Sequence, residues 1–332
     1  MSGVPSPEDS PSPLTLLTAE PKDVIQIVRD RAEIDVWQPL PKETLDALRT
    51  ATEEFPEKPM RFIDRAVDPD LQTLRGFEHL QVLSIQSSLP TTFDVLAGFT
   101  SLRRLGLADT RSKSVSLSFL ENCVELRDLR IEGHSRDIES ISRLSKLKLL
   151  WLISSRISSL DALARHPSIE RLGILKSKVR DLSPLASAAL LSRLWIGTVR
   201  NLTGSDLEPL ANTSVKMLAL NNQPWIEDLS YLGLPGITHL SLDNLSRIRS
   251  LSALVQWPVL EMLGLRQARP SAGDLATVCQ SSSLRHLTIG QSVSRRELTD
   301  IKDHFRGDSL RYSGSTLRGD PPSGVIVSNI DL

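Results

Sequence analysis

The 332-residue sequence has only two cysteines, two tyrosines and seven phenylalanines, and it has no surplus of charge of either sign. Two cysteines cannot build a disulfide framework and suit a reducing compartment. The net charge of -1 argues against general nucleic-acid binding, which needs a basic surface. No apolar run reaches the roughly 20 residues of a membrane helix, and residues 1–13 lack the pattern of a secretion signal. We therefore expect a cytoplasmic protein that binds neither nucleic acid nor membrane.

The sequence patterns of common catalytic sites are missing as well. No glycine is followed by lysine, which excludes a phosphate-binding P-loop. No two glycines lie two or four positions apart, which excludes the dinucleotide-binding and nucleophile-elbow patterns. No histidine precedes a glutamate, so the zinc-protease helix motif is absent. We expect a non-enzymatic chain without cofactor or metal.

Leucine is the residue in excess: the 56 leucines make up about one residue in six. A core built mainly from one aliphatic side chain indicates an internal repeat. The template L-x-x-L-x-L, with Ile or Val allowed, occurs ten times at spacings of 21 to 24 residues. A second pattern of period three, as in Ile157-Leu160-Leu163, predicts a turn or 3₁₀ return to the next strand. The templates begin at Leu80, Leu102, Leu126, Leu147, Ile169, Leu191, Val215, Ile237, Leu260 and Leu284.

With these ten templates the sequence resembles the leucine-rich repeat family, particularly its short-repeat class of bacterial internalin-like proteins. The resemblance covers about residues 67–293 and implies an α/β solenoid. In such a curved rod a parallel β-sheet forms the concave face, short helical or 3₁₀ returns lie behind it, and each end is capped. We assign residues 14–66 and 294–313 to the caps and expect loose tails at 1–13 and 314–332.

Short patterns predict the elements of the two caps. Helical spacing of apolar residues predicts helices over Lys42–Phe55 and Arg295–Phe305. Runs of strand-forming residues favour short strands at Val24–Val28, Met60–Val67 and Ser309–Ser313.

One position departs from the family pattern. Eight residues after the first template Leu, the family usually has Asn, whose side chain bonds buried backbone groups. We expect the Ser and Thr hydroxyls found here to replace part of this ladder, whereas Val199, Leu245 and Ala268 cannot. The ten residues at this position are Ser88, Thr110, His134, Ser155, Ser177, Val199, Gln223, Leu245, Ala268 and Ser292.

The template also predicts which side chains face outward. Its fourth and sixth positions point into the core, and its third, fifth and seventh positions point to the concave face. Trp151 and Trp195 then share one outward row, with Gly173 between them and a groove above it. A register shift of one residue would bury both tryptophans instead. Around them we expect Leu149, Ile153, Leu175, Met217, Arg130, Arg171 and Arg193.

This mixture of Trp, Met and Arg among small residues is typical of an interface hot spot. We therefore interpret these ten residues as a site for a protein or peptide partner. Inhibitor, immunity protein and scaffold all fit this function, and the oligomeric state is left open. The remaining tryptophans, Trp37, Trp225 and Trp257, are expected to pack in the cap or the return loops, and Cys123 and Cys279 are expected to be small packed side chains.

Two alternatives use the same face. An enzyme with a nonstandard site would use acid, base and anion-binding groups on the later strands, and His239 and Asp243 could interact along one strand. A nucleic acid could stack its bases on the tryptophans, but Asp128 and Glu132 are expected in the same patch and would repel phosphate. The candidate enzyme residues are His239, Asp243, Arg266 and His286.

Overall fold

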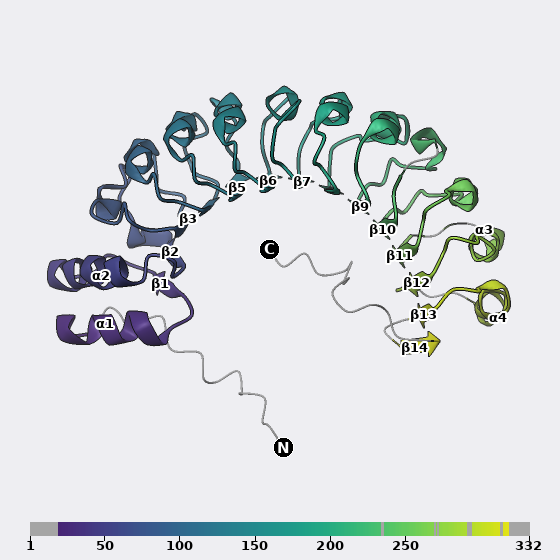
Figure 1. Ribbon diagram of the computed structural model, residues 1–332, viewed down its shortest axis with the longest axis horizontal. Helices are drawn as coiled ribbons and strands as arrows, with labels where there is room; N and C mark the ends of the chain where they lie inside the picture. The colour runs from purple at the N-terminus through teal and green to yellow at the C-terminus, as the bar shows by residue number, and fades with distance from the viewer. Residues whose placement is uncertain are drawn as a thin grey trace, which may run out of the picture. The chain divides into compact units, whose positions relative to one another are not determined.

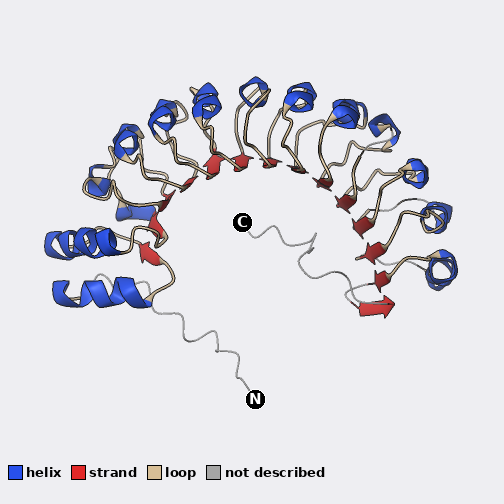
Figure 2. Cartoon of the chain, in the orientation of Figure 1, coloured by secondary structure: helices blue, strands red, loops and turns tan. Residues whose placement is uncertain are grey.

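A computed structural model of the chain describes residues 19–233, 236–268, 270, 272–290, 294–312 and 315–318. The chain divides into two compact units, residues 1–147 and 148–332. In each unit the strands form one layer, and the helices and 3₁₀ segments lie on one side of that layer (Figures 1 and 2). The expected tail at residues 1–13 and most of the expected tail at 314–332 lie outside the described residues.

The first unit begins with a helix, strand, helix arrangement and continues as a parallel sheet. Its α-helices are α1 (Pro21–Asp30) and α2 (Lys42–Glu54). Each strand pairs in parallel with the next one along the chain. The strands are β1 (Ile34–Val36), β2 (Met60–Ile63), β3 (Val82–Gln86), β4 (Arg104–Leu107) and β5 (Asp128–Glu132). The 3₁₀ segments are Asp64–Ala66, Gln72–Leu74, Asp94–Gly98, Ser118–Asn122 and Ile138–Arg143.

The second unit continues the same repeat. Strands β6 to β13 pair in parallel in chain order, and β14 pairs antiparallel with β13. The strands are β6 (Leu149–Ile153), β7 (Arg171–Leu175), β8 (Arg193–Gly197), β9 (Met217–Asn221), β10 (His239–Asp243), β11 (Met262–Arg266), β12 (His286–Ile289), β13 (Ser309–Tyr312) and β14 (Ser315–Arg318). The helices are α3 (Ala272–Val278) and α4 (Arg295–His304), with 3₁₀ segments at Asp161–Leu163, Ser183–Ser187, Ser205–Asn212, Ser230–Leu232 and Ser252–Gln256.

Burial confirms the predicted register in all ten repeats. The side chains at the fourth and sixth template positions, such as Leu194 and Ile196, are each at most 2% exposed. Strand pairing sets equal template positions side by side, so Trp151 pairs with Gly173 and Gly173 with Trp195. The predicted solenoid with one parallel sheet is therefore confirmed. We call the surface formed by the third, fifth and seventh positions the open face.

The caps agree with the sequence except in two places. The expected helices are α2 and α4, and Ser294 and Glu297 form a reciprocal capping box at the start of α4. The strand expected at Val24–Val28 is wrong, because these residues belong to helix α1. Val24 and Val28 lie four residues apart, so the helix buries both on one side, and this burial outweighs the strand preference of valine. The other strands expected in the caps are present in β2 and β13, while β14 falls within the expected loose tail.

The polar ladder is carried by different residues from those expected. His134 and Gln223 are fully buried and reach the backbone of the preceding repeat: His134 Nε2 lies 3.1 Å from the carbonyl of Ala108. The amide of Gln223 donates to the Val199 carbonyl at 3.1 Å and accepts from the Val199 N–H at 3.0 Å. Thr110 instead donates to its own loop, at the carbonyl of Ser112. Long side chains therefore replace the family's Asn in the third and seventh repeats, and the expectation for the Ser and Thr hydroxyls is met only in part.

At the first ladder position the predicted residue is replaced by its neighbour. In the first repeat Ser88 is exposed, and its neighbour Ser87 is buried and donates to the Asp64 carbonyl. Ser87 therefore fills the position predicted for Ser88. Ser292, expected in the last repeat, lies outside the described residues.

Strands β6 to β11 all end in the same way. The residue that follows the last outward position has a positive φ between 50° and 54°, although none of these residues is glycine. This left-handed residue turns the chain inward, so that the next residue enters the core as the ladder residue. Asn222 and Asn244 are suited to this conformation, whereas Lys176 is held in it by the repeat. The six residues are Ser154, Lys176, Thr198, Asn222, Asn244 and Gln267.

Candidate functional site

Two indoles form one continuous aromatic surface on the open face of β6 to β8. Trp151 on β6 and Trp195 on β8 are both half-buried, and their ring centroids lie 5.3 Å apart at an interplanar angle of 34°. Neither ring is sealed in the core, because Leu150 and Leu194 beside them occupy that space. The outward orientation predicted for both tryptophans is therefore confirmed, and the alternative register is excluded.

The groove predicted over Gly173 is wrong, because the indole of Trp151 fills it. A Cβ atom at Gly173 would lie 1.9 Å from Cε3 and 2.1 Å from Cζ3 of Trp151. The indole therefore lies flat across β7 and reaches Trp195 on the far side. Leu175 covers Gly197 in the same way, with its Cδ2 2.5 Å from the corresponding Cβ position. The site is thus a filled apolar platform in which each glycine makes room for a large side chain from the preceding strand.

The close contact at Gly173 gives a direct test of the platform. Gly173→Ala should displace the Trp151 indole and separate it from Trp195, because the new methyl group would overlap the ring. The loss of coupling between the two indoles should appear in the far-ultraviolet circular dichroism and in the tryptophan fluorescence. Gly264→Ala, in the same row on β11, is the matched control, since its nearest neighbour is 3.8 Å away. Identical spectra for the two variants would contradict the stacked arrangement.

Aliphatic residues border the platform. Leu149 and Met217 are half-buried on the same face, and Leu175 is half-buried beside Gly197. Ile153 is only 4% exposed, so it packs beneath the platform and offers a partner little contact area. The structure therefore brings together nine of the ten predicted site residues in the second unit.

Two arginines give the platform its charge. Arg171 and Arg193 are neighbours in register on β7 and β8. In the described part of the chain, neither guanidinium forms an ion pair or a side-chain hydrogen bond. The nearby Glu170 is already bound to Lys148 at 2.8 Å; this hydrogen bond and the positive charges around it lower the pKa of its carboxyl. Arg171 and Arg193 contribute to this lowering, so the Glu170 carboxylate offsets part of their charge, although neither guanidinium is paired with it directly.

The tenth predicted residue, Arg130, lies on β5 in the first unit and belongs to the open face of that unit. Asp128 and Glu132, which were expected to repel phosphate groups in the tryptophan patch, also lie on β5 in the first unit. Asp128 forms an ion pair with Arg104 at 3.3 Å. The expected repulsion therefore does not arise within the second unit, where the tryptophans lie.

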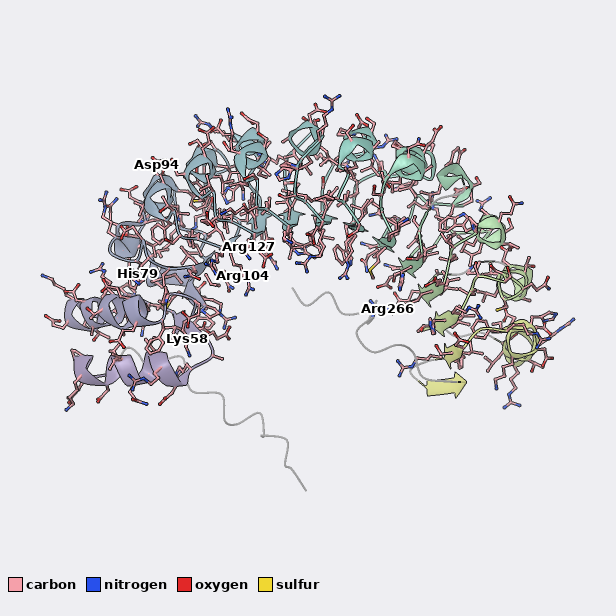
Figure 3. All side chains as sticks on the ribbon, viewed as in Figure 1. Lys58, His79, Asp94, Arg104, Arg127 and Arg266 are labelled. Carbon is pink, nitrogen blue, oxygen red and sulfur yellow. The ribbon has the colours of Figure 1, made fainter. Side chains whose placement is uncertain are left out.

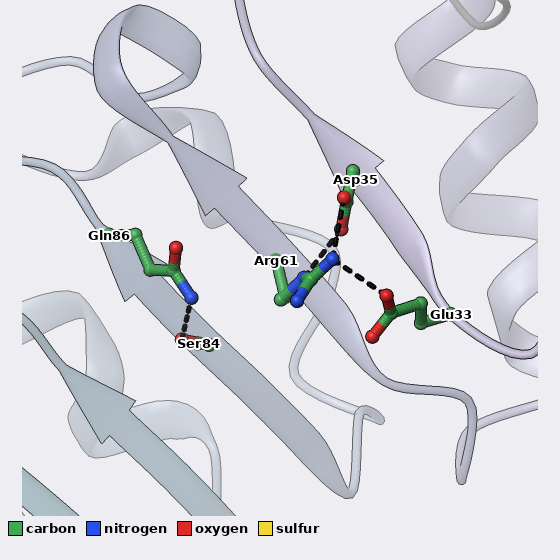
Figure 4. Close-up of polar contacts among 5 residues, drawn as sticks. All are labelled: Glu33, Asp35, Arg61, Ser84 and Gln86. Carbon is green, nitrogen blue, oxygen red and sulfur yellow. Dashed lines mark hydrogen bonds and ion pairs between the residues drawn. The ribbon is translucent and has the colours of Figure 1, made fainter. Parts of the chain in front are cut away.

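The open face of the first unit is polar and largely compensated. Arg61 on β2 binds Asp35 at 2.6 Å and Glu33 at 2.7 Å, and these acids together with their hydrogen bonds raise its pKa, while partial burial opposes the rise (Figure 4). On β3, Gln86 donates to Ser84 at 3.4 Å (Figure 4). Polar groups that already bond one another within the protein add little free energy of binding when a partner covers them, in contrast to the apolar platform of the second unit.

The residues of the enzyme alternative do not form a common site. Asp243 accepts hydrogen bonds from Asn221, at 2.8 Å, and from Arg266, which extends from β11 (Figure 3). The Nδ1 of His239 lies 2.8 Å from its neighbour Thr238, and that of His286 lies 2.9 Å from Ser309. Burial lowers the pKa of His239. The charge of Glu261 opposes this lowering, while the charges of His286 and Arg193 add to it. The predicted His239–Asp243 interaction is thus replaced by separate pairs, which gives catalysis no support.

The other tryptophans differ in their surroundings. Trp257 is 1% exposed and packs as expected, but Trp37 and Trp225 are 40% and 43% exposed. The guanidinium of Arg247, in the next repeat, lies 4.2 Å from the Trp225 ring centroid. The packing predicted for Trp37 and Trp225 is therefore wrong, because a return loop lets a side chain turn outward without disturbing the leucine core. Cys123 and Cys279 are buried as expected, and burial raises the pKa of each thiol to about 12.

The described residues contain neither a candidate metal site nor a candidate membrane span. Within these residues no three His, Cys, Asp or Glu side chains come together in a group that could hold a metal ion. No helix in the described ranges is long and apolar enough to cross a bilayer.

Comparison with known proteins identifies the fold. No protein-family model and no curated sequence matches the chain. Among solved structures it is similar to the internalin InlF of Listeria monocytogenes, with 17% identity, coverage of 89% of this chain and 94% of that one, and a TM-score of 0.55. It is also similar to a leucine-rich repeat protein of Leptospira interrogans, with 14% identity, coverage of 89% and 86%, and a TM-score of 0.50. Together with the ten regular repeats, these similarities show that the chain has the leucine-rich repeat fold of the short-repeat, internalin-like class.

Proposed function

We propose that the chain is a non-enzymatic binding module that captures a protein or peptide on the open face of its second unit. The observation that carries this proposal is the stacked, half-buried pair of Trp151 and Trp195 on an otherwise regular sheet. Exposed apolar patches on soluble proteins commonly mark contact sites, and tryptophan is enriched among the residues that dominate binding energy. Repeat folds present broad surfaces of this kind to their partners.

The geometry of the platform also favours binding. Trp151 is held between the backbone of Gly173 and the ring of Trp195, so its orientation is already set in the free protein. A partner therefore does not have to order these side chains, and the entropic cost of association is reduced. Such a module can act as an inhibitor, an immunity protein or a scaffold, and the identity of the partner decides among these roles. The cytoplasmic location stays a prediction.

The test is affinity capture from the organism that encodes the chain, with quantitative comparison of three baits. The baits are the native protein, Trp151→Ala/Trp195→Ala, and the control Ser241→Ala/Thr288→Ala, which alters the same face away from the platform. A protein retained by the native and control baits but lost from the tryptophan variant is the expected result. Loss of an anchor should weaken its purified complex by about 2 kcal/mol or more for Trp195→Ala alone. Equal retention by all three baits would contradict the proposal.

A further inference from the structure

The charged, aromatic and aliphatic side chains of the platform lie in separate rows across the strands, and this arrangement indicates which kind of partner surface would fit it. On β6 to β9 the third template position contributes the row Leu149, Arg171, Arg193 and Met217, and the fifth contributes Trp151, Gly173, Trp195 and Ala219. The seventh contributes Ile153, Leu175, Gly197 and Asn221. Neighbouring rows lie about 6.6 Å apart and neighbouring strands about 4.8 Å apart. A cationic row thus runs along one side of an aromatic and aliphatic surface.

In the described part of the second unit neither arginine of this row forms an ion pair, and Glu170, the carboxylate on which both charges act, is bound to Lys148. At the outward positions of β6 to β12 the charged residues are Arg171, Arg193, Asp243 and Arg266. Asp243 is bound by Arg266 and Asn221, so the carboxylate on this part of the face is already occupied. The field of Arg193 also extends across the sheet, since its charge helps to lower the pKa of His239 on β10. Arg171 and Arg193 therefore make the platform net positive, although the whole chain carries a net charge of -1.

A partner that covers the indoles also needs groups that can pair with the neighbouring arginines. A partner surface that covers the neighbouring row as well as Trp151 and Trp195 also removes water from the guanidinium groups of Arg171 and Arg193. An ion that is buried without a counter-ion costs several kcal/mol, which would cancel much of the gain from the apolar contact. A carboxylate matches the planar arginine fork with two parallel hydrogen bonds and removes this penalty. A neutral or basic partner surface cannot do so.

We infer that the partner presents an apolar stripe bordered on one side by carboxylates, as on an acidic amphipathic helix laid across β6 to β9. This inference rests on the proposed function and specifies its ligand. The carboxylates meet Arg171 and Arg193, and the apolar stripe covers the two tryptophans and Leu175. On a helix, side chains three and four residues apart are about 5–6 Å apart, which matches the spacing of the strands. Two arginines are few for a nucleic acid, whose affinity comes largely from many Lys and Arg contacts with phosphates.

The experiment uses a display library of random peptides selected separately on three forms of the full chain. These are the native protein, Arg171→Glu/Arg193→Glu, and Trp151→Ala/Trp195→Ala. The native protein should select peptides that combine an apolar cluster with two or more Asp or Glu residues. Their affinity should fall by about tenfold or more for the charge-reversed form, which is about 1.4 kcal/mol. Peptides with Lys in place of the acids should bind the charge-reversed form more tightly than the native one.

The control for the charge change is Arg103→Glu/Arg127→Glu, which reverses the charge of two exposed arginines of the first unit; Arg127 is labelled in Figure 3. It should bind the selected peptides like the native protein. If the charge-reversed form fails a thermal unfolding check, Arg171→Gln/Arg193→Gln takes its place and should still lose affinity.

The possible failures can be told apart. Peptides that need the tryptophans but are neutral or basic would overturn this inference and leave the binding function standing. Peptides that bind all forms equally would overturn both. An oligothymidylate that binds the native protein more tightly than the peptides, with a steep loss in salt, would identify a nucleic-acid ligand and overturn the inference as well.

Discussion

Leu194→Ala should lower the free energy of unfolding by about 2–5 kcal/mol, because it removes a fully buried side chain and leaves a cavity in a close-packed core. Leu194 is 1% exposed and its outward neighbour Trp195 is half-buried. Trp195→Ala should cost less than Leu194→Ala, because its ring is half-exposed and the stacked pair adds only about 0.5–1.5 kcal/mol beyond the area that it buries. Two adjacent residues thus differ in effect because successive side chains of a strand point to opposite faces.

The measurement is equilibrium unfolding in urea, followed by circular dichroism, for the native protein and both variants. The denaturant slope should stay unchanged if each variant unfolds as the native protein does. Leu240→Ala, at the equivalent inward position of β10, is the matched control and should resemble Leu194→Ala. A larger loss for Trp195→Ala than for Leu194→Ala would overturn the register of β8 and with it the platform.

Gln223→Met should cost about 2–6 kcal/mol, although it keeps the volume of the side chain. Gln223 is fully buried, and its amide bonds both the N–H and the carbonyl of Val199. The thioether of methionine cannot replace these bonds, so two buried backbone groups lose their partner at about 1–3 kcal/mol each. Thr198, the third group bound by Gln223, loses less because its N–H also donates to the Asn221 carbonyl.

A second ladder residue provides the comparison for Gln223. Ser155 occupies the same template position after β6, and among the described residues its buried hydroxyl has no hydrogen-bond partner. Ser155→Ala should therefore be close to neutral in the same urea titration. Equal losses for the two variants would mean that volume and not hydrogen bonding determines the cost at this position.

The fold could be predicted because the same physical pattern occurs ten times. One L-x-x-L-x-L segment is ambiguous, but ten segments at nearly constant spacing allow only a stacked arrangement in which the leucines bury one another. The cap was less predictable, because Val24–Val28 occurs once and both a strand and a helix can bury its valines. The ladder was predicted from residue types, yet side-chain reach decides whether a polar group meets the preceding repeat, as Gln223 and Thr110 show.

The composition of the candidate site followed from the same register. Alternation along the strand is enough to place Trp151, Trp195, Arg171 and Arg193 on one face. The groove over Gly173 was wrong because strand spacing gives the separation of Cα atoms and not the direction in which a long side chain leans. A glycine between two tryptophans indicates space for one of the rings as readily as space for a ligand.

The sequence by itself determined the repeat, the inward leucines and the residues that face outward, because these depend on local periodicity and on the burial of apolar area. Only the tertiary structure decided which outward groups satisfy one another. Asp243 is bound by Arg266 from the next strand, while Arg171 and Arg193 form no ion pair among the described residues. Trp151 lies against Trp195 and leaves no groove. Hydrogen bonds, ion pairs and ring contacts require positions within a few ångströms, and side chains from separate repeats reach such positions only when the strands stack.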